Sequence, residues 1–326
     1  MSGLSYSSHS GLGPTLSVLG GSRLAHALAG TGIRLDIGAA SVRIRSNADS
    51  LARDLSAAYA HFPFEDSADF ADVHVQIRRA PGPRRWFKPQ VIFRCDGQRP
   101  FEPFPADSAL PLFEWGCNWM IGHRLNDLLL LHAGAVERDG LALLLPAVPG
   151  SGKSTLTAAL SMRGWRLLSD EFGAFDPASG SFRAILKPIA LKNQSIEVIR
   201  RFAPNAAFGP EFPKTRKGTV AHLVAQPDSV ARRHEAALPG AVVLPKWQAN
   251  SPTRWEPLAE HTLFAALAFN AFNYNVLGAD GFAAVVQLVR QCPAWQLVYS
   301  DLDEALATID AAWPQVLERH KRPSNL

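Results

Sequence analysis

The sequence predicts an α/β fold, and two observations lead to this prediction. Apolar stretches of strand length, residues 128–131, 141–145 and 165–168, are interleaved with a segment of helical spacing at about residues 153–163. A glycine-rich loop separates the second of these strands from the helix. A strand, a loop, a helix and a strand in this order make a βαβ unit, whose sheet is buried on at least one face.

The composition is that of a globular chain with a sizeable core. The 326 residues suffice for one large domain or two ordinary ones, and 47% of them are hydrophobic and 19% charged. The formal net charge is only +4, without a long run of like charges, so we expect no nucleic-acid partner. Apolar stretches are too short for a membrane span, and the Ser- and Gly-rich N-terminus lacks the basic and apolar regions of a signal peptide. We therefore expect a cytoplasmic protein without a membrane partner.

The three cysteines, Cys95, Cys117 and Cys292, are odd in number and far apart in the chain. This spacing predicts neither a disulfide framework nor a zinc site. We expect unreactive thiols in a reducing compartment.

Periodicity divides the chain into three regions. Residues 1–30 are rich in Ser, Gly and other small residues, which predicts a flexible or weakly helical lead-in. Residues 31–107 are predicted to form a small α+β region, and residues 108–326 a larger α/β domain that begins with a helix at 108–127. The strands expected in the α+β region are 32–37, 41–45, 73–77 and 91–94, and its helix is 48–62.

Beyond residue 176 the pattern is less regular. Residues 203–219 contain several prolines and glycines, which predicts a mobile loop. The basic residues of this loop, Lys214, Arg216 and Lys217, are candidates for a phosphate-binding lid, or else they form a solvated surface. The other expected elements are strands at 185–191, 241–244 and 295–299, and helices at 196–202, 258–271, 279–292 and 301–313.

The segment PAVPGSGKST at residues 146–155 fits the Walker A phosphate-binding loop, with Ala147 at the position of the first glycine. A loop with inward-pointing N–H groups can wrap a polyanionic triphosphate, and the following helix directs its positive end at the phosphates. We predict ATP as the ligand, with Lys153 at the β- and γ-phosphates and Ser154 on Mg²⁺. The predicted nucleotide-binding residues of the loop are Ala147, Val148, Pro149, Gly150, Ser151, Gly152, Lys153, Ser154 and Thr155.

Two adjacent carboxylates, Asp170 and Glu171, follow the strand at 165–168. Ligands of open α/β sheets lie at the carboxyl ends of strands, which puts this pair near the phosphate loop. There the pair can hold Mg²⁺ or accept a proton from an attacking hydroxyl, and a helix cap or a solvated turn is the alternative interpretation. His132, just after the strand at 128–131, is a further site candidate, although a single histidine near apolar residues is commonly structural.

The order of these motifs resembles the catalytic domain of HPr kinase/phosphorylase. Here HAGAV at 132–136 is followed by an apolar strand, the loop AVPGSGKST, a helix ending in RGWRLL, and SDE at 169–171. This is similar to the family pattern, in which a histidine strand precedes the phosphate loop and a helix ending in Arg-Gly leads to two acidic residues. The resemblance is closest to the HPr-kinase-related bacterial kinases, including the HprK-related kinase A branch, and it is specific over residues 128–223.

The resemblance implies a P-loop kinase fold of the HPr kinase/phosphoenolpyruvate carboxykinase type and phosphoryl transfer from ATP to a serine hydroxyl. It implies that Asp170 is the catalytic base, Glu171 its acidic neighbour and His132 the site histidine. Two positions depart from the pattern. Glu171 stands where the family usually has a second Asp, and ALKN at 190–193 replaces an EIRG-type stretch, which removes a metal-binding carboxylate and leaves Lys192 in place of the arginine charge.

We therefore predict an ATP- and Mg²⁺-dependent kinase whose acceptor is a serine of a protein or peptide. HPr itself is not the expected acceptor, because the segment that contacts HPr is not recognisable, and a homo-oligomer is compatible with the sequence. The alternatives are a small-molecule kinase, a nucleotide-responsive binding module with little turnover, and an ATPase. The predicted catalytic residues are Asp170, Lys153, His132 and Glu171; Lys192 and Lys217 are added to the nucleotide-binding set; the metal ligands are Ser154, Asp170 and Glu171.

Overall fold

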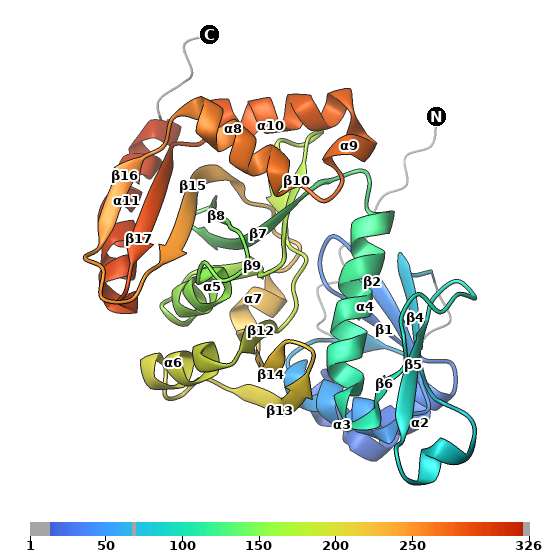
Figure 1. Cartoon of the computed structure of the whole chain (residues 1–326). Helices are drawn as coiled ribbons and strands as arrows, with labels where there is room; N and C mark the ends of the chain where they lie inside the picture. Colours follow the sequence, from blue (N-terminus) through green and yellow to red (C-terminus); the bar gives the residue numbers. More distant parts are fainter. Residues whose placement is uncertain (1–13, 67–69, 322–326) are drawn as a thin grey trace, which may run out of the picture.

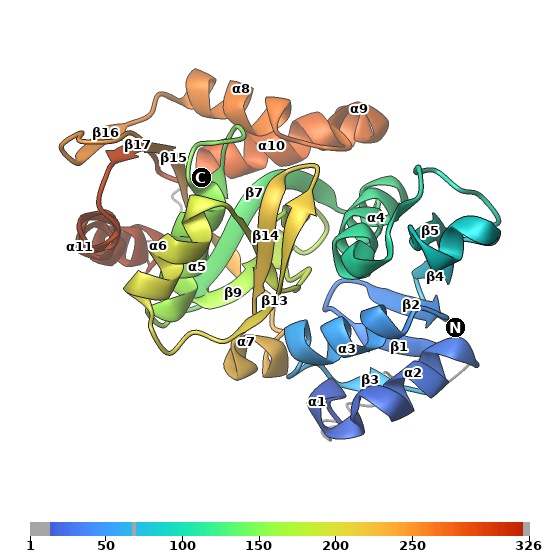
Figure 2. The same cartoon turned by 60° about the horizontal axis from the view of Figure 1, so that its bottom comes forward.

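The protein combines helices with three β-sheets, and the predicted α/β class is confirmed. The computed structural model describes residues 14–66 and 70–321. One unit is built on a six-stranded sheet from the N-terminal part of the chain, and another on an eight-stranded sheet from the C-terminal part (Figure 1). A three-stranded sheet lies where the two units meet, as the view in Figure 2 shows.

The N-terminal sheet follows the alternating pattern that predicts half-buried strands. Val73, Val75 and Ile77 face the core, while the residues between them are more exposed. The strand order is β3-β1-β2-β4-β5-β6, with β2 and β4 parallel and the other pairs antiparallel. The strands are β1 (Ile33–Asp36), β2 (Ser41–Ser46), β3 (Phe64–Glu65), β4 (Val73–Arg79), β5 (Gln90–Arg94) and β6 (Phe104–Pro105), and helix α3 spans Asp49–Ala58.

The lead-in predicted for residues 1–30 falls partly outside the described residues, which begin at residue 14. From there the chain forms two helices, α1 (Leu16–Leu19) and α2 (Gly21–Ala29), which agrees with the helical alternative of the prediction and not with the flexible one. Leu24 and Leu28 are buried, because their spacing of four residues puts both on the side of α2 that faces the sheet. Of the small residues of this helix, Gly21, Ser22 and Ala29 are exposed, while Ala25 and Ala27 are partly buried against the core.

Helix α4 (Ala109–Arg124) packs on the N-terminal sheet, although residue 108 was the predicted start of the second domain. A Cβ atom on Gly116 would lie 1.9 Å from the ring of Phe93, so this glycine is what lets α4 approach β5 closely. Trp115, the residue before Gly116, stacks on Phe101. The helix therefore belongs to the N-terminal unit, and the second unit begins after residue 125.

The C-terminal sheet has the order β11-β10-β7-β8-β15-β17-β16, with β9 paired to β7. Because β7 is antiparallel to both β8 and β9, the last two strands run in the same direction on either side of it. Their carboxyl ends lie at one edge, where Pro146 pairs with Ala133 and Ser169 with Ala135. The strands are β7 (Leu129–Arg138), β8 (Leu141–Pro146), β9 (Arg166–Ser169), β10 (Phe172–Asp176), β11 (Ser181–Arg183), β15 (Leu238–Trp247), β16 (Arg254–Pro257) and β17 (Ala294–Tyr299).

Helices cover this sheet, and the last of them is longer than expected. Helix α11 (Leu302–Lys321) continues past Pro314, because the buried side chains of Trp313 and Val316 hold it against the sheet. None of the helices in the described ranges is both long and apolar enough to cross a bilayer. The remaining helices are α5 (Lys153–Met162), α6 (Gln194–Phe202), α7 (Pro227–Ala231), α8 (Glu260–Phe269), α9 (Tyr274–Leu277) and α10 (Ala279–Gln291).

The predicted mobile loop at 203–219 is wrong for most of its length. Strand β13 (Phe208–Thr215) pairs with β14 (Gly218–Leu223), which also pairs with β12 (Ile189–Lys192). Pro210 and Pro213 are tolerated because β13 is the edge strand, where a missing N–H breaks few ladder bonds. The hairpin therefore presents its turn, residues 216–217, at a defined place.

A buried ionic cluster joins the two units. The Lys187 ammonium is 2.8 Å from a carboxylate oxygen of Glu114 on α4 and also donates to Asn118. The Tyr59 hydroxyl of the N-terminal unit donates to the other Glu114 oxygen. Both charged side chains are less than a tenth exposed, at 7% for Lys187 and 9% for Glu114. Burial by itself lowers the pKa of Lys187, but the charge and hydrogen bond of Glu114 outweigh burial and raise it.

We expect Glu114→Gln to lower the free energy of unfolding by about 3 kcal/mol, because it leaves the Lys187 charge buried and unpaired. Lys187→Met should cost a similar amount, and the double variant should cost clearly less than the sum of the two. Urea denaturation of all three variants measures this coupling. The control is Arg79→Gln, which breaks an exposed pair with Asp49 and should cost less than about 1 kcal/mol. Strict additivity of the two single variants would contradict the expectation.

Candidate functional site

The glycine-rich loop between β8 and α5 is held by hydrogen bonds from the ends of β15 and β17. The Trp247 N–H, at the end of β15, donates to the Ser151 carbonyl at 2.8 Å. Gly150 and Gly152 have φ values of +87° and +88°, a left-handed conformation that residues with a Cβ adopt only at a cost. The loop therefore has the turned backbone that phosphate-binding loops require.

Gly152 is also a point of close contact. A Cβ atom at this position would lie 2.5 Å from the Tyr299 hydroxyl oxygen and 3.0 Å from the Trp247 Cβ. The Tyr299 hydroxyl, which is buried, lies 3.3 Å from the Gly152 carbonyl oxygen and donates to it. The ends of β15 and β17 thus form the wall against which the loop rests.

Lys153, the first residue of α5, is directed toward the end of β9. Its ammonium donates to the Asp170 carbonyl oxygen and lies 3.6 Å from the carboxylate atom Oδ1 of the same residue. The side chain is only 10% exposed. Because β8 and β9 end at the same edge of the sheet, the loop lysine and the acidic pair meet there as predicted.

Asp170 is the most unusual polar group of this region. Its side chain is 4% exposed, and neither carboxylate oxygen accepts a hydrogen bond from the part of the chain that the structure describes. The turn that carries it is fixed, because the Ser169 hydroxyl accepts hydrogen bonds from the N–H groups of Glu171 and Phe172. A buried carboxylate costs free energy unless it is compensated, and the ammonium of Lys153 is the only charge within salt-bridge distance among the described residues.

His132 and Glu171 lie side by side, with 3.7 Å between the His132 Nε2 and a Glu171 carboxylate oxygen. Burial and the positive charge of Lys153 lower the pKa of His132, although Glu171 and Asp170 act in the opposite direction. Burial alone raises the pKa of Glu171, but the nearby charges of Lys153, Lys187, His132 and Lys192 outweigh burial and lower it. At neutral pH, His132 is therefore uncharged and Glu171 is an anion.

The loop, His132 and Glu171 border a cavity of about 860 Å³. Lys192, at the end of β12, and Lys217, in the turn between β13 and β14, border it from the other side. Burial lowers the pKa of Lys192, and the neighbouring charges of Lys217 and Lys153 lower it further. The ammonium groups of Lys217 and Lys153 therefore lie close enough to Lys192 to repel it, while Glu171 and Asp170 attract it.

Most of the predicted site residues meet at this cavity. Residues 148–155 of the loop border it together with His132, Glu171, Lys192 and Lys217. Ala147 is buried beneath the loop, and Asp170 lies behind Lys153. The structure does not bring Lys214 and Arg216 to this cavity: Lys214 borders another cavity, and the Arg216 guanidinium lies over the ring of Phe104.

Several residues at the cavity were not predicted as site residues. Trp247 and Tyr299 support the loop, and neither stands in a motif that marks such a role. Asp301 and Asp303 also border the cavity, in the segment that follows β17. Gln194, Ser195, Val198, Arg201 and Phe202 of α6 complete the wall.

The oxygen donors at this edge fit Mg²⁺ shared with a phosphate group. Mg²⁺ in kinases and ATPases is held by one or two carboxylates and a hydroxyl together with substrate phosphates. The unpartnered oxygens of Asp170 supply such donors, and Ser154 and Glu171 border the adjoining cavity. Within residues 14–66 and 70–321, no three or more His, Cys, Asp and Glu side chains come together, so a metal cage made by the protein alone is not present there.

Comparison of the chain with protein-family models finds no match. Comparison with curated proteins also finds no significantly similar sequence. Neither comparison bears on the resemblance to HPr kinase, so a function has to be inferred from the residues of the cavity.

We expect Gly152→Ala to destabilise the protein by at least about 1 kcal/mol more than Gly150→Ala. Both variants force a Cβ into the left-handed region, which costs about 1–2 kcal/mol. Only the added methyl group at residue 152 meets other atoms, because open space surrounds Gly150. Chemical denaturation of the two variants measures the difference, and equal losses of stability would contradict the contact with Tyr299.

We also expect the His132 imidazole to titrate below its ordinary pKa of about 6.5. Lys153→Met should raise this pKa and Glu171→Gln should lower it, because the first removes a repelling charge and the second an attracting one. NMR titration of the imidazole signals measures both shifts. The pKa of His132 is lower in the folded state than in the unfolded state. The unfolded state therefore binds a proton first as the pH falls below about 6.5, and the protein loses stability until the folded-state pKa is passed. Identical titration curves in all three proteins would contradict the arrangement.

Proposed function

We propose that this chain is an ATP-dependent kinase of the HPr kinase-like type, which transfers the γ-phosphoryl group to a serine hydroxyl of a protein or peptide. The observation that carries the proposal is the convergence at one sheet edge of the glycine-rich loop, three ammonium groups and a buried carboxylate that has no hydrogen-bond partner among the described residues. A triphosphate would match the glycine-rich loop and the ammonium groups. An acceptor hydroxyl together with Mg²⁺ would match the buried carboxylate.

The ammonium groups favour a polyanionic ligand. Burial and the charges of Lys217 and Lys153 lower the pKa of Lys192, although Glu171 and Asp170 act in the opposite direction. A triphosphate between the three ammonium groups would relieve the repulsion of Lys192 and would accept hydrogen bonds from the loop N–H groups. Lys192 and Lys217 come from segments far from the loop in sequence, so their meeting there supports a ligand with several negative charges.

The Asp170 carboxylate, which is buried next to Lys153 and does not itself border the cavity, suits the role of a base when Lys153 turns toward the phosphates. In the proposed step, the acceptor hydroxyl gives its proton to Asp170 while its oxygen forms a bond to the γ-phosphorus of ATP. The bond from that phosphorus to the β,γ-bridging oxygen breaks, and ADP leaves with the electron pair. Mg²⁺, when bound, neutralises charge on the phosphates. Lys153 keeps Asp170 in place through its hydrogen bond to the Asp170 carbonyl oxygen.

An apolar surface beside the cavity favours a protein or peptide acceptor over a small molecule. The Phe272 ring, which is 52% exposed, lies 5.5 Å from the His132 ring. Phe269 is 83% exposed and directly precedes Asn270. The backbone carbonyl of Asn270 accepts a hydrogen bond from the backbone N–H of His132. Exposed aromatic side chains next to a catalytic cavity are typical of surfaces that bind other proteins.

One observation favours the alternative of a nucleotide-responsive binding module with little turnover. Ala190 and Lys192 border the cavity where the family pattern has a metal-binding carboxylate and an arginine. A site with one carboxylate fewer holds Mg²⁺ less firmly, which would slow transfer more than it weakens nucleotide binding. A measurement of phosphoryl transfer therefore distinguishes the kinase from the binding module.

We expect Asp170→Asn to slow phosphoryl transfer by about a hundredfold or more, because the base is lost. ATP binding should persist in this variant, and the gain in ATP affinity on adding Mg²⁺ should shrink. Radiolabelled γ-phosphate on co-purified proteins and synthetic peptides measures transfer, and calorimetry with and without Mg²⁺ measures binding.

Lys153→Met is the companion variant, and it should weaken ATP binding itself. Undiminished transfer by Asp170→Asn would remove this residue from the role of base. Tight ATP binding by the wild type without transfer to any acceptor would favour the binding module. Absence of ATP binding by the wild type would end both proposals.

A further inference from the structure

A second cavity, of about 310 Å³, lies between α3, the short 3₁₀ helix η2 (Ala106–Ser108) and strand β13. It borders the opposite edge of the three-stranded sheet from the cavity beside the glycine-rich loop, since the sheet order is β12-β14-β13. β13 approaches α3 closely next to it, because Gly209 would place a Cβ only 3.1 Å from that of Ala58. The cavity is thus formed by both units of the protein and is separate from the site described above.

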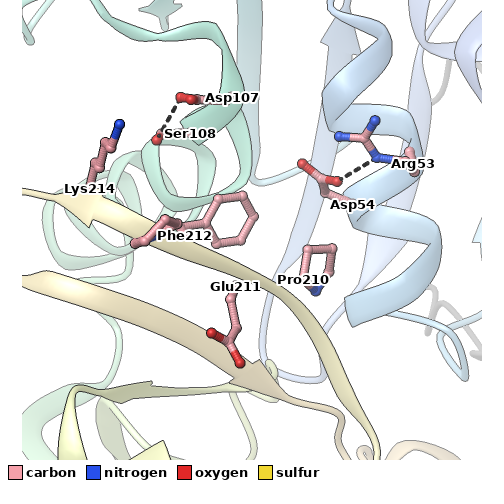
Figure 3. Close-up of a pocket in the computed structure, with 9 residues that line it drawn as sticks. Arg53, Asp54, Asp107, Ser108, Pro210, Glu211, Phe212 and Lys214 are labelled. Carbon is pink, nitrogen blue, oxygen red and sulfur yellow. Dashed lines mark hydrogen bonds and ion pairs between the residues drawn. The ribbon is translucent and has the colours of Figure 1, made fainter.

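The Asp54 carboxylate faces this cavity (Figure 3). Its side chain is 1% exposed, and one oxygen, Oδ1, accepts a hydrogen bond from Arg53 at 3.0 Å. The other oxygen, Oδ2, has no hydrogen-bond partner in the described part of the chain. Burial raises the pKa of Asp54 even though the Arg53 charge acts in the opposite direction. The carboxylate is therefore only partly compensated, and its buried Oδ2 can accept one further hydrogen bond.

The other groups around the cavity favour a cation. Figure 3 shows the Phe212 ring directed toward the side of the cavity where Asp54 lies, with Pro210 below it. Asp107, in η2, adds a second carboxylate to the border. A carboxylate beside an aromatic ring and apolar walls is a common environment for organic ammonium and guanidinium groups.

The nearby cations leave the Oδ2 atom of Asp54 without a hydrogen-bond partner among the described residues. Arg53 is 73% exposed at its side chain and contacts only one of the two Asp54 oxygens. Figure 3 shows Lys214 on the far side of Phe212 from Asp54. A bare metal ion is not favoured, because no three or more metal-ligating side chains come together in residues 14–66 or 70–321. The cavity volume is at the lower end of ligand sites, which restricts the ligand to a small one.

We propose that this cavity binds a small organic cation, a primary ammonium or guanidinium group on a short apolar stem, through the free oxygen of Asp54. The ammonium donates to Asp54 Oδ2, and the stem packs on Phe212 and Pro210. Binding at this place does not depend on ATP binding or on kinase activity, so it can be tested by itself.

Butylamine and butylguanidine are the probes, and 1-butanol is the neutral control of similar shape. Each is titrated into the full-length protein while amide signals of α3 and β13 are followed by NMR. We expect saturable shifts at Asp54 and Phe212 with either cation and none with 1-butanol. Asp54→Asn should weaken butylamine binding at least about tenfold, as the loss of a charge-assisted hydrogen bond would. Its urea midpoint should be equal to or above that of the wild type, because a partly compensated buried charge is removed.

Arg53→Gln is the matched variant, and it should raise the affinity for butylamine that Asp54→Asn lowers. It removes the cation that competes for Asp54 while the exposed side chain leaves the packing unchanged, so butylamine should bind several-fold more tightly. Absence of saturable shifts at α3 and β13 in the wild type and in Arg53→Gln would overturn the proposal. Equal affinity of Asp54→Asn and wild type, or equal shifts with 1-butanol, would overturn it as well. A loss of stability in Asp54→Asn without any cation binding would assign Asp54 a purely structural role.

Discussion

The position of β7 between β8 and β9 determines where the charged groups of the cavity beside the glycine-rich loop lie. Because β7 is antiparallel to both neighbours, the loop after β8 and the acidic pair after β9 emerge at the same edge. Lys153 can then reach back across that edge to the Asp170 carbonyl oxygen. Two glycines make this close packing feasible: a Cβ on Gly134 of β7 would lie 2.1 Å from the Thr157 hydroxyl of α5, and one on Gly173 of β10 would lie 2.8 Å from Leu144. The site geometry thus depends on strand direction and on close backbone packing beneath it.

The electrostatics of this edge are unfavourable for the protein alone. Lys192 is deprotonated more easily than an ordinary lysine, since burial and the charges of Lys217 and Lys153 disfavour its charged form. Asp170 is buried without a hydrogen-bond partner among the described residues. Such arrangements are rare in a core, where polar groups are normally paired. They persist where the surrounding structure fixes them and a ligand compensates them, and a phosphate chain with its cation would compensate both groups together.

Local features of the sequence were enough to predict the loop, Lys153, the acidic pair and the strands that carry them. These residues stand within about forty positions of one another, and each is recognisable from its neighbours. Trp247 and Tyr299 were not predictable, because they come to the loop through β15 and β17, whose place in the sheet depends on long-range pairing. β13 was missed because Pro210 and Pro213 resemble a loop, and only an edge position makes them compatible with a strand. α11 continues past Pro314 because buried contacts of Trp313 and Val316 outweigh one lost hydrogen bond.

The two units are linked through the charge of Lys187. Glu114 and Asn118 of α4 hold its ammonium in the interior, and this charge is one of those that lower the pKa of Glu171 at the cavity. The N-terminal unit therefore acts on the site through a fixed buried charge as well as through packing. If residues 14–125 were removed, Lys187 would lose its carboxylate partner and could rotate into solvent, and Glu171 would lose one source of its lowered pKa. The candidate site is for this reason a property of the whole chain, and the C-terminal unit by itself does not reproduce its electrostatics.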